Sequence, residues 1–370
     1  MSVSLNGTNG LTFNDASTQN TSAFYGGLAF RNRIINGAMG ISQRSTASFT
    51  QTTAVQYTLD RWFAYGSVAS KFTVQQNAGS VTPPAGFINY LGVTSSSAYS
   101  ISSTDLFQIV QRVEGLNISD FAWGTASAAS VTLSFWVRSS LTGTFGGSIG
   151  NSAYTRSYPF SYTISSANTW EQKSVTIAGD TSGTWLTTNG VGLYISIGLG
   201  VGSTYSGTAG AWAGTEYDSA TGATSVVGTN GATFYITGVQ LEKGSTATSY
   251  DHRPYGTELQ LCQRYYWRSV SGVLYSTFAI GVVDSAASCS GVYAKHPVTM
   301  RTTPTCSFSN LRLSDGTGAP AVTSLAGNWS STESWSQGFN ASGAGLTQGR
   351  AVAIQSNGSL TSYIDASAEL

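Results

Sequence analysis

The sequence has few charged residues and no surplus of either sign. Asp, Glu, Lys and Arg make up 9% of the 370 residues, and 17 basic residues balance 17 acidic ones. A chain without a basic surplus lacks the attraction that draws proteins to nucleic acids and anionic membranes, so we predict neither partner. No stretch approaches the ~18 consecutive apolar residues of a membrane-spanning helix. We therefore predict no membrane insertion.

Cysteine and histidine are also scarce. The three cysteines, Cys262, Cys289 and Cys306, are odd in number and confined to the last third, which argues against a disulfide framework. The two histidines, His252 and His296, lie at no zinc-site spacing and in no nucleophile motif. We predict no metal and no cofactor. The start, MSVSLNGTNGLTF, lacks the positive and apolar regions of a signal peptide, so we expect folding in a cytosol.

Carboxylates that could cleave a glycan are few. Glycosidic hydrolysis uses two carboxyl groups roughly 5–10 Å apart. Glu216 and Asp218 share one loop with aromatic residues and are the pair that we would test. Most other acidic residues stand in turn-like segments or beside a basic neighbour. We predict that the protein is not an enzyme.

Glycine and aromatic residues are abundant instead. There are 43 glycines, and aromatic residues reach 12%, which suits short strands joined by turns. Apolar and polar residues alternate in VTLSFWV (131–137), LYISIGL (193–199) and FYITGVQL (234–241), which predicts strands with one buried face. Residues 106–113 also fit a helical stripe, but the neighbouring strands favour a strand. The sequence predicts an all-β protein.

Turn-forming dipeptides separate these segments: Gly146-Gly147, Asn189-Gly190 and Asn230-Gly231. Asn357-Gly358 predicts a hairpin between two alternating arms. Residues 257–268 have the spacing of one or two helical turns. We predict three parts: a short extended N-terminal segment (1–30), a larger β-sandwich (31–255) and a smaller C-terminal β-sandwich (256–370).

Four segments carry a family resemblance: RNRIINGAMGISQR (31–44), YTLDRWF (57–63), the stretch from VTLSFWV to GDTSGTW (131–185) and FYITGVQLEKGSTATSYDHRPYGTELQLCQRYY (234–266). Together they closely resemble bacteriophage tail-fibre or tail-associated receptor-binding proteins. The resemblance implies a homotrimeric virion protein, assembled in the host cytoplasm, that binds a bacterial surface glycan. It also implies that residues 1–30 join other tail or capsid proteins of the virion.

Residues 31–255 also look like a jelly-roll carbohydrate-binding module. Asn36-Gly37 and Trp62 lie near the start of such a module, and an FYI-x-x-V-x-L strand lies near its end. In that family, carboxylates of the two terminal motifs hold a structural calcium. Uncharged residues stand at the matching places here: Ala38, Met39, Thr237 and Gly238. Because calcium prefers carboxylates among its oxygen ligands, this departure supports the prediction of no metal.

Aromatic residues in two Gly- and Ser-rich loops are the candidates for glycan binding: Tyr205, Trp212 and Tyr217 in residues 203–231, and Trp329 and Trp335 in residues 326–345. A sugar stacks its apolar C–H face on an aromatic ring, while amides and hydroxyls bind its hydroxyl groups. Alternatively, these rings pin the loops to the sandwich or fill a trimer interface. Three further tryptophans fall in strand-like patterns and are predicted to lie in the core: Trp62, Trp136 and Trp170.

Asp251, His252 and Arg253 follow the last predicted strand of the larger sandwich, just before Pro254. A guanidinium binds carboxylates or carbonyls through paired hydrogen bonds, and Asp251 is placed to pair with His252 or Arg253. We interpret the three residues as an interdomain clamp rather than a catalytic group.

We therefore predict a tail-fibre adhesin that binds a host-surface glycan without cleaving it, through loops of residues 256–370. Two alternatives stay open. The first is a capsid decoration or other tail or baseplate protein that makes only protein contacts. The second is a glycan depolymerase.

Overall fold

The computed structural model describes residues 4–6, 10–12, 18–19 and 30–370. Strands dominate, and the described residues contain one α-helix, α1 (Tyr255–Gln263), which confirms the all-β prediction. No helix in these ranges is long and apolar enough to span a membrane. The predicted attachment segment 1–30 lies mostly outside the described residues. Its described pieces form a three-stranded antiparallel sheet of β1 (Ser4–Asn6), β2 (Gly10–Thr12) and β3 (Thr18–Gln19).

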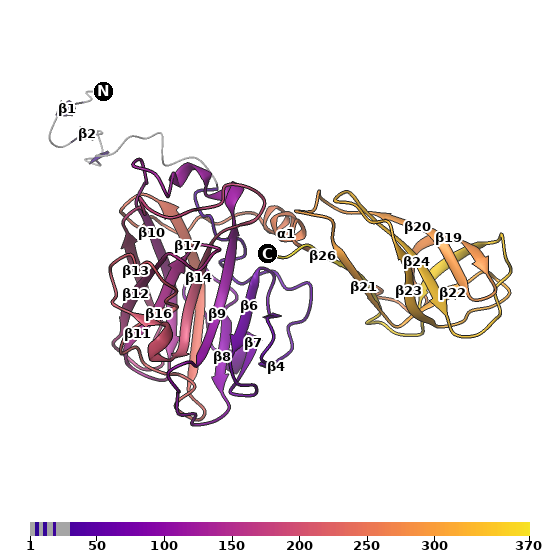
Figure 1. Cartoon of the computed structure of the whole chain (residues 1–370), viewed down its shortest axis with the longest axis horizontal. Coiled ribbons are helices and arrows are strands. Elements are labelled where there is room, and N and C mark those ends of the chain that lie inside the picture. The colour runs from indigo at the N-terminus through magenta and orange to yellow at the C-terminus, as the bar shows by residue number, and fades with distance from the viewer. Residues whose placement is uncertain (1–3, 7–9, 13–17, 20–29) are drawn as a thin grey trace.

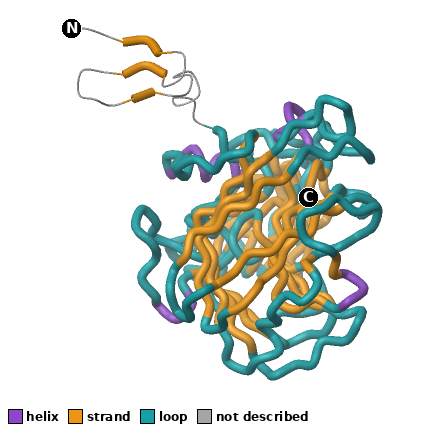
Figure 2. The backbone as a smooth tube through the Cα atoms, turned by 90° about the vertical axis from the view of Figure 1, so that its left-hand side faces the viewer, coloured by secondary structure: helices purple, strands orange, loops and turns teal. Residues whose placement is uncertain are grey.

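The larger unit is a sandwich of two six-stranded antiparallel sheets (Figure 1), as predicted. Seen from the side, its loops gather at the two ends of the strands (Figure 2). We name the sheets after their longest strands. The β17 sheet has the order β13 (Glu171–Ile177), β10 (Val131–Ser139), β17 (Thr233–Lys243), β8 (Leu91–Ser95), β7 (Phe72–Gln76) and β4 (Phe49–Thr50). The β14 sheet has the order β12 (Ser157–Ile164), β11 (Gly143–Gly150), β14 (Val191–Val201), β9 (Leu106–Glu114), β6 (Trp62–Gly66) and β5 (Gln56–Tyr57).

Alternation along the strands builds the core between these sheets. Phe135 and Val137 of β10 and Ile195 and Ile197 of β14 are fully buried in one apolar cluster. Burying each such side chain contributes about 1.5–3 kcal/mol of transfer free energy. The ambiguous segment 106–113 lies within strand β9, which confirms the choice of strand over helix.

The tryptophan predictions were right once in three. Trp62 is fully buried in the core. Trp136 is half-buried, because its two inward-facing neighbours on β10 turn it to the outer face. Trp170 is also half-buried, and its indole N–H donates to the Thr82 carbonyl oxygen at 2.9 Å. The prediction of a core position was therefore wrong for Trp136 and Trp170.

Gly146-Gly147 lies inside strand β11 rather than in a turn. A Cβ atom at Gly147 would lie 2.4 Å from the Ser196 carbonyl oxygen and 2.5 Å from the ring of Phe160. Close packing, and not a chain reversal, requires glycine at this position.

The smaller unit has its own apolar core, which includes the fully buried Trp335, Phe339 and Ile354. Its strands form two sheets. The three-stranded sheet has the order β18 (Tyr266–Val270), β26 (Tyr363–Ser367) and β21 (Thr305–Ser309). The six-stranded sheet has the order β22 (Leu311–Ser314), β25 (Ala351–Ser356), β19 (Thr277–Ser285), β20 (Ser288–Lys295), β24 (Ser334–Ala341) and β23 (Val322–Asn328).

Of two local predictions in this half, one is confirmed and one is wrong. The one or two helical turns expected within residues 257–268 are present as α1, which ends at Gln263 before the chain continues as strand β18. The hairpin expected around Asn357-Gly358 is absent, because β25 pairs with β19 and β22 while β26 pairs with β18 and β21. The dipeptide lies where the chain crosses from one sheet to the other.

Arg253 contacts both sides of the junction between the units. One guanidinium nitrogen lies 3.1 Å from a carboxylate oxygen of Glu258 in α1 and 3.2 Å from the Ile34 carbonyl oxygen. The other nitrogen donates to the Asn32 carbonyl oxygen. These contacts fit the clamp that we predicted for this residue.

Its two neighbours have different partners from those expected. The Asp251 carboxylate accepts a hydrogen bond from the Asn32 backbone N–H at 3.3 Å, and among the described residues it forms no ion pair with His252 or Arg253. The His252 ring packs on Phe87, with ring centroids 5.3 Å apart. Both residues therefore hold the larger unit together near the junction.

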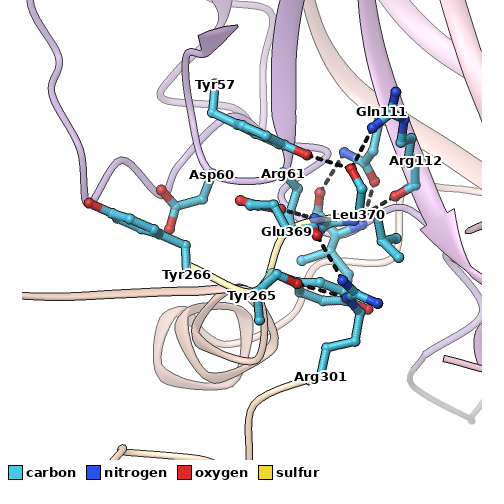
Figure 3. A network of polar contacts seen from close by, with 12 residues as sticks. Tyr57, Asp60, Arg61, Gln111, Arg112, Tyr265, Tyr266, Arg301, Glu369 and Leu370 are labelled. Carbon is cyan, nitrogen blue, oxygen red and sulfur yellow. Dashed lines mark hydrogen bonds and ion pairs between the residues drawn. The ribbon is translucent and has the colours of Figure 1, made fainter. Parts of the chain in front are cut away.

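A polar network holds the last residues of the chain against the larger unit (Figure 3). The buried Arg61 guanidinium pairs with the Glu369 carboxylate and lies over the Tyr265 ring at 3.6 Å. Arg44 approaches the same carboxylate at 3.1 Å. From the smaller unit, Arg301 donates to the Glu369 backbone oxygen at 2.8 Å. Glu369 thus binds cationic groups from both units.

Two further contacts extend this junction along the β14 sheet. The Leu370 backbone oxygen accepts hydrogen bonds from the Tyr57 hydroxyl at 3.0 Å and from Arg112 at 2.5 Å. Glu114, at the end of β9, accepts two hydrogen bonds from Arg264 at 2.9 and 2.6 Å. The end of β9 is therefore tied to the smaller unit at two residues.

We expect Glu369→Ala to destabilise the protein by about 3–5 kcal/mol, because the buried Arg61 charge would lose its carboxylate partner. Denaturant unfolding followed by tryptophan fluorescence measures this loss. Glu333→Ala is the matched control, because Glu333 is exposed, and should change the free energy of unfolding by no more than about 0.5 kcal/mol. Equal small losses in both variants would contradict the importance of this ion pair.

Candidate functional site

The β14 sheet has a second face that does not pack against the other sheet. Its strands pair in register, so that Phe63 of β6 lies opposite Val110 of β9 and Tyr65 lies opposite Gln108. On the other side of β9, Arg112 lies opposite Tyr194 of β14. Since neighbours along each of these strands point into the core, these side chains all lie on the outer face.

Residues 203–231, predicted to be a long loop and here called the insertion, cover part of this outer face. They contain a short parallel pair, β15 (Ser206–Gly207) and β16 (Ser219–Ala220), and β16 contacts β11, β12 and β14. Glycines on the sheet make this approach possible: a Cβ atom at Gly146 would lie 2.3 Å from the Ser219 hydroxyl oxygen, and one at Gly198 would lie 2.9 Å from it.

A cleft of about 250 Å³ lies between this insertion and the uncovered part of the sheet. The sheet contributes six of the residues that line it: Phe63, Tyr65, Gln108, Val110, Arg112 and Tyr194. The insertion contributes Tyr205, Glu216 and Asp218. Three of its tyrosine rings, those of Tyr65, Tyr154 and Tyr205, are half-buried or exposed. The cleft therefore offers accessible aromatic rings together with amide, guanidinium and carboxylate groups.

Asp218 has an unusual environment in this cleft. Its side chain is buried, with 2% of the residue exposed, and one carboxylate oxygen has no hydrogen-bond partner in the described part of the chain. Burial, together with the nearby Glu216 carboxylate, raises the pKa of Asp218 to about 7. Burial also raises the pKa of Glu216. The insertion thus holds two acidic groups that retain protons more readily than exposed carboxyls do.

The hydroxyl of Tyr194 is a second polar group of the cleft without a partner among the described residues. Tyr194 is buried, and the ring of the more exposed Tyr154 lies 5.2 Å away. Glycine at position 150 makes room for it, because a Cβ atom there would lie 2.3 Å from the Tyr194 hydroxyl oxygen. Burial, followed by the charge of Asp218, raises the pKa of Tyr194.

Of the three predicted aromatic residues in the insertion, Tyr205 lines the cleft. Trp212 packs against Trp185 and Tyr158, with centroids 5.5 and 5.2 Å away, and its indole N–H donates to a backbone oxygen at 2.8 Å. The ring of Tyr217 lies on Gly207, where a Cβ atom would come within 2.3 Å. Trp212 and Tyr217 thus fit the alternative that we left open, in which rings pin the loop to the sandwich.

The two predicted tryptophans of the smaller unit lie apart from this cleft. Trp329 is 61% exposed and rests on Gly327. Trp335 is fully buried in strand β24, so the prediction that it contacts a glycan was wrong. Its Ser- and Gly-rich surroundings are typical of a loop, but the side chain faces the core of the smaller unit.

Sequence reasoning missed the floor of the cleft. The floor consists of residues at alternate positions of strands whose other face is mainly apolar: Phe63, Tyr65, Gln108, Arg112 and Tyr194. That pattern was visible in LFQIVQRV, where Gln108 and Arg112 interrupt the apolar residues. Aromatic and polar residues on the second face of a predicted strand were the missed signal.

Other hollows of the molecule fit a ligand less well. One of about 460 Å³ is lined by Arg31, Arg33, Asp120, Glu242 and Lys243. Arg33 and Lys243 form ion pairs with Asp120 at 3.0 and 3.8 Å, so these three charged groups already have partners within the protein. Within the described ranges, no group of three or more His, Cys, Asp or Glu side chains is placed to hold a metal ion.

Comparisons with known proteins give only distant likenesses. No family model matches the sequence, and a search of curated proteins gives no match. Among solved structures, the enzymatically active domain of bacteriophage CBA120 tailspike protein 4 is 12% identical at a TM-score of 0.33, covering 58% of this chain and 22% of that one.

Two further solved structures are similar over nearly their whole length. A putative sugar-binding protein from Bacteroides thetaiotaomicron is 14% identical at a TM-score of 0.33, covering 58% of this chain and 100% of that one. The carbohydrate-binding module TmCBM61, solved with β-1,4-galactotriose, is 10% identical at a TM-score of 0.29, covering 58% and 99%. Because the sequence identities are at most 14% and the TM-scores at most 0.33, these three structures do not indicate what this chain binds.

The raised pKa of Asp218 predicts a pH-dependent contribution to stability. The folded protein keeps a proton that the unfolded chain releases near pH 4, so the stabilisation is full below pH 4 and is lost as the pH rises through about 7. We expect Asp218→Asn to gain stability relative to the parent protein by up to ~4 kcal/mol between pH 4 and 8, at ~1.4 kcal/mol per pH unit.

Denaturant unfolding of both proteins at several pH values measures this difference. The exposed Asp284 gives the control, since Asp284→Asn should stay within about 0.5 kcal/mol of the parent throughout. A difference for Asp218→Asn that does not change with pH would contradict the assigned environment.

Proposed function

We propose that this protein is a glycan-binding adhesin that holds a host-surface glycan in the cleft of the β14 sheet without cleaving it. The observation that carries the proposal is that accessible aromatic rings and polar side chains line one and the same cleft. Tyr65 and Tyr205 offer rings for the C–H face of a sugar, while Gln108 and Arg112 offer hydrogen bonds to its hydroxyl groups. A concave site with aromatic walls and a few convergent polar groups is typical of small-ligand sites.

The wider role in this proposal is that of a bacteriophage tail-fibre or receptor-binding protein. It rests on the sequence resemblance over residues 31–266, and it includes the homotrimer, the virion location and attachment through residues 1–30. Threefold display would strengthen weak single-site binding, because the second and third contacts form at a high effective concentration. The exposed ring of Trp329 on the smaller unit is a second candidate contact for the same glycan.

One observation favours glycan cleavage as a second candidate function. Glu216 and Asp218 line the same cleft, and Asp218 holds its proton up to about pH 7. A general acid of a glycosidase needs such a raised pKa, with a second carboxylate opposite it.

The binding proposal predicts that Tyr65→Ala and Tyr205→Ala each weaken glycan binding about tenfold, or ~1.4 kcal/mol. A glycan array with the full chain would first identify a ligand, and calorimetry would then give the dissociation constants. Trp329→Ala tests the second candidate contact. Tyr293→Ala, which removes an exposed ring of β20, is the control and should leave affinity unchanged. Binding that survives both cleft variants would exclude the cleft.

The non-cleaving part of the proposal predicts that no reducing ends appear when the protein is incubated with the glycan that it binds. A colorimetric assay of reducing sugars over a day at pH 5–8 measures this. Release that disappears in both Glu216→Gln and Asp218→Asn would instead establish the second candidate function. Release that persists in both variants would point to a contaminating enzyme.

A further inference from the structure

One end of the cleft is acidic and has no basic partner. Glu216 and Asp218 both line it, and neither belongs to any ion pair among the described residues. The guanidinium that lines the same cleft, that of Arg112, already donates to the Leu370 backbone oxygen at 2.5 Å. Among the described residues, neither carboxyl group therefore has a cationic side chain within ion-pair distance.

The other buried aspartates show how unusual this is. Asp180 accepts two hydrogen bonds from Arg156 at 2.8 and 2.7 Å, and Asp365 accepts from Arg268 at 2.9 Å. Asp218, equally buried, keeps one oxygen without a partner. Buried polar groups are nearly always hydrogen-bonded, so an exception that lines an open cleft points to a missing ligand.

Tyr194 gives an independent indication of the same kind. The residue lines the same cleft, and its hydroxyl is buried without a hydrogen-bond partner among the described residues. A hydroxyl accepts hydrogen bonds as well as donating them. Three acceptor groups, from Asp218, Glu216 and Tyr194, thus line one small space.

We propose that this acidic end binds the ammonium group of an aminated sugar, the free amine of a hexosamine residue. The inference rests on the proposed function and names the class of glycan. An ammonium donates three hydrogen bonds and brings one positive charge, which matches the acceptors and the uncompensated charge. An N-acetylated amine and a hydroxyl each donate one hydrogen bond and bring no positive charge.

Binding of a cation would change the titration of Asp218. The charged or titratable groups that line the cleft with it are Glu216, Tyr65, Tyr154, Tyr194, Tyr205 and Arg112. Because an ammonium beside a carboxyl favours its charged form, the pKa of Asp218 should fall when the amine binds. By linkage, amine binding should weaken as the pH falls below the pKa that the Asp218 carboxyl has in the protein without ligand.

The first experiment follows the Asp218 carboxyl by ¹³C NMR in the full chain, with the signal assigned by its loss in Asp218→Asn. Saturating glucosamine should lower the titration midpoint by at least one pH unit, a tenfold change in the proton equilibrium. N-acetylglucosamine should leave the midpoint unchanged. An unchanged midpoint with glucosamine, or an equal shift with both sugars, would overturn the proposal. An equal shift with Ca²⁺ alone would assign the site to a metal ion and overturn it as well.

The second experiment compares oligosaccharides that differ only in free amine versus N-acetyl groups, by calorimetry at pH 7. The free-amine form should bind at least tenfold more tightly, and this ratio should fall towards one in Asp218→Asn and in Glu216→Gln. Asp284→Asn, at an exposed carboxyl of the smaller unit, should keep the ratio.

Failure of this inference and failure of the proposed function give different results. If glycans bind in the cleft with no preference for the amine, the binding proposal stands and the amine site is rejected. If no oligosaccharide binds, the proposed function fails, and the carboxyl titration with glucosamine still decides whether the acidic end takes an amine.

Discussion

Pairing of β9 with β6 on one side and β14 on the other forces the side chains of all three strands to alternate between two faces. Phe107 and Ile109 enter the core, so Gln108 and Val110 must lie on the outer face. A slip of one residue in this pairing would exchange the two sets and place polar groups in the core. The apolar core therefore also fixes which side chains form the floor of the cleft.

The insertion turns this outer face into a cleft. Without it, the uncovered strands would form an open surface with few convergent groups. Glycines at positions 146 and 198 let residues 219–220 come close to the sheet, and the same chain then carries Glu216 and Asp218 to the edge of the exposed half. Burying an acidic group without a partner costs free energy, since desolvation favours its neutral form. That cost is concentrated at the cleft, where a ligand could offset it.

Much of the fold could be predicted from the sequence because its cause is local. Alternation in 131–137, 193–199 and 234–241 identified strands, and composition identified the all-β class. The errors arose where the partner is distant in sequence. Asn357-Gly358 has the local features of a hairpin, yet its flanking strands find partners in different sheets. Trp335 has sequence neighbours that are typical of a loop, but the pairing of β24 with β20 places its side chain in the core.

The site was only partly predictable for a related reason. The sequence marked the insertion and its residues Tyr205, Glu216 and Asp218, because an aromatic loop with two acids stands out in a chain with little charge. It did not mark the floor, since a strand pattern shows that two faces exist without showing which face meets a second sheet. Nor did it show that Arg112, next to the inward-facing Gln111, binds the backbone of Leu370. The floor of the cleft and the junction between the units share this guanidinium, so movement of the smaller unit would change the groups that face a ligand.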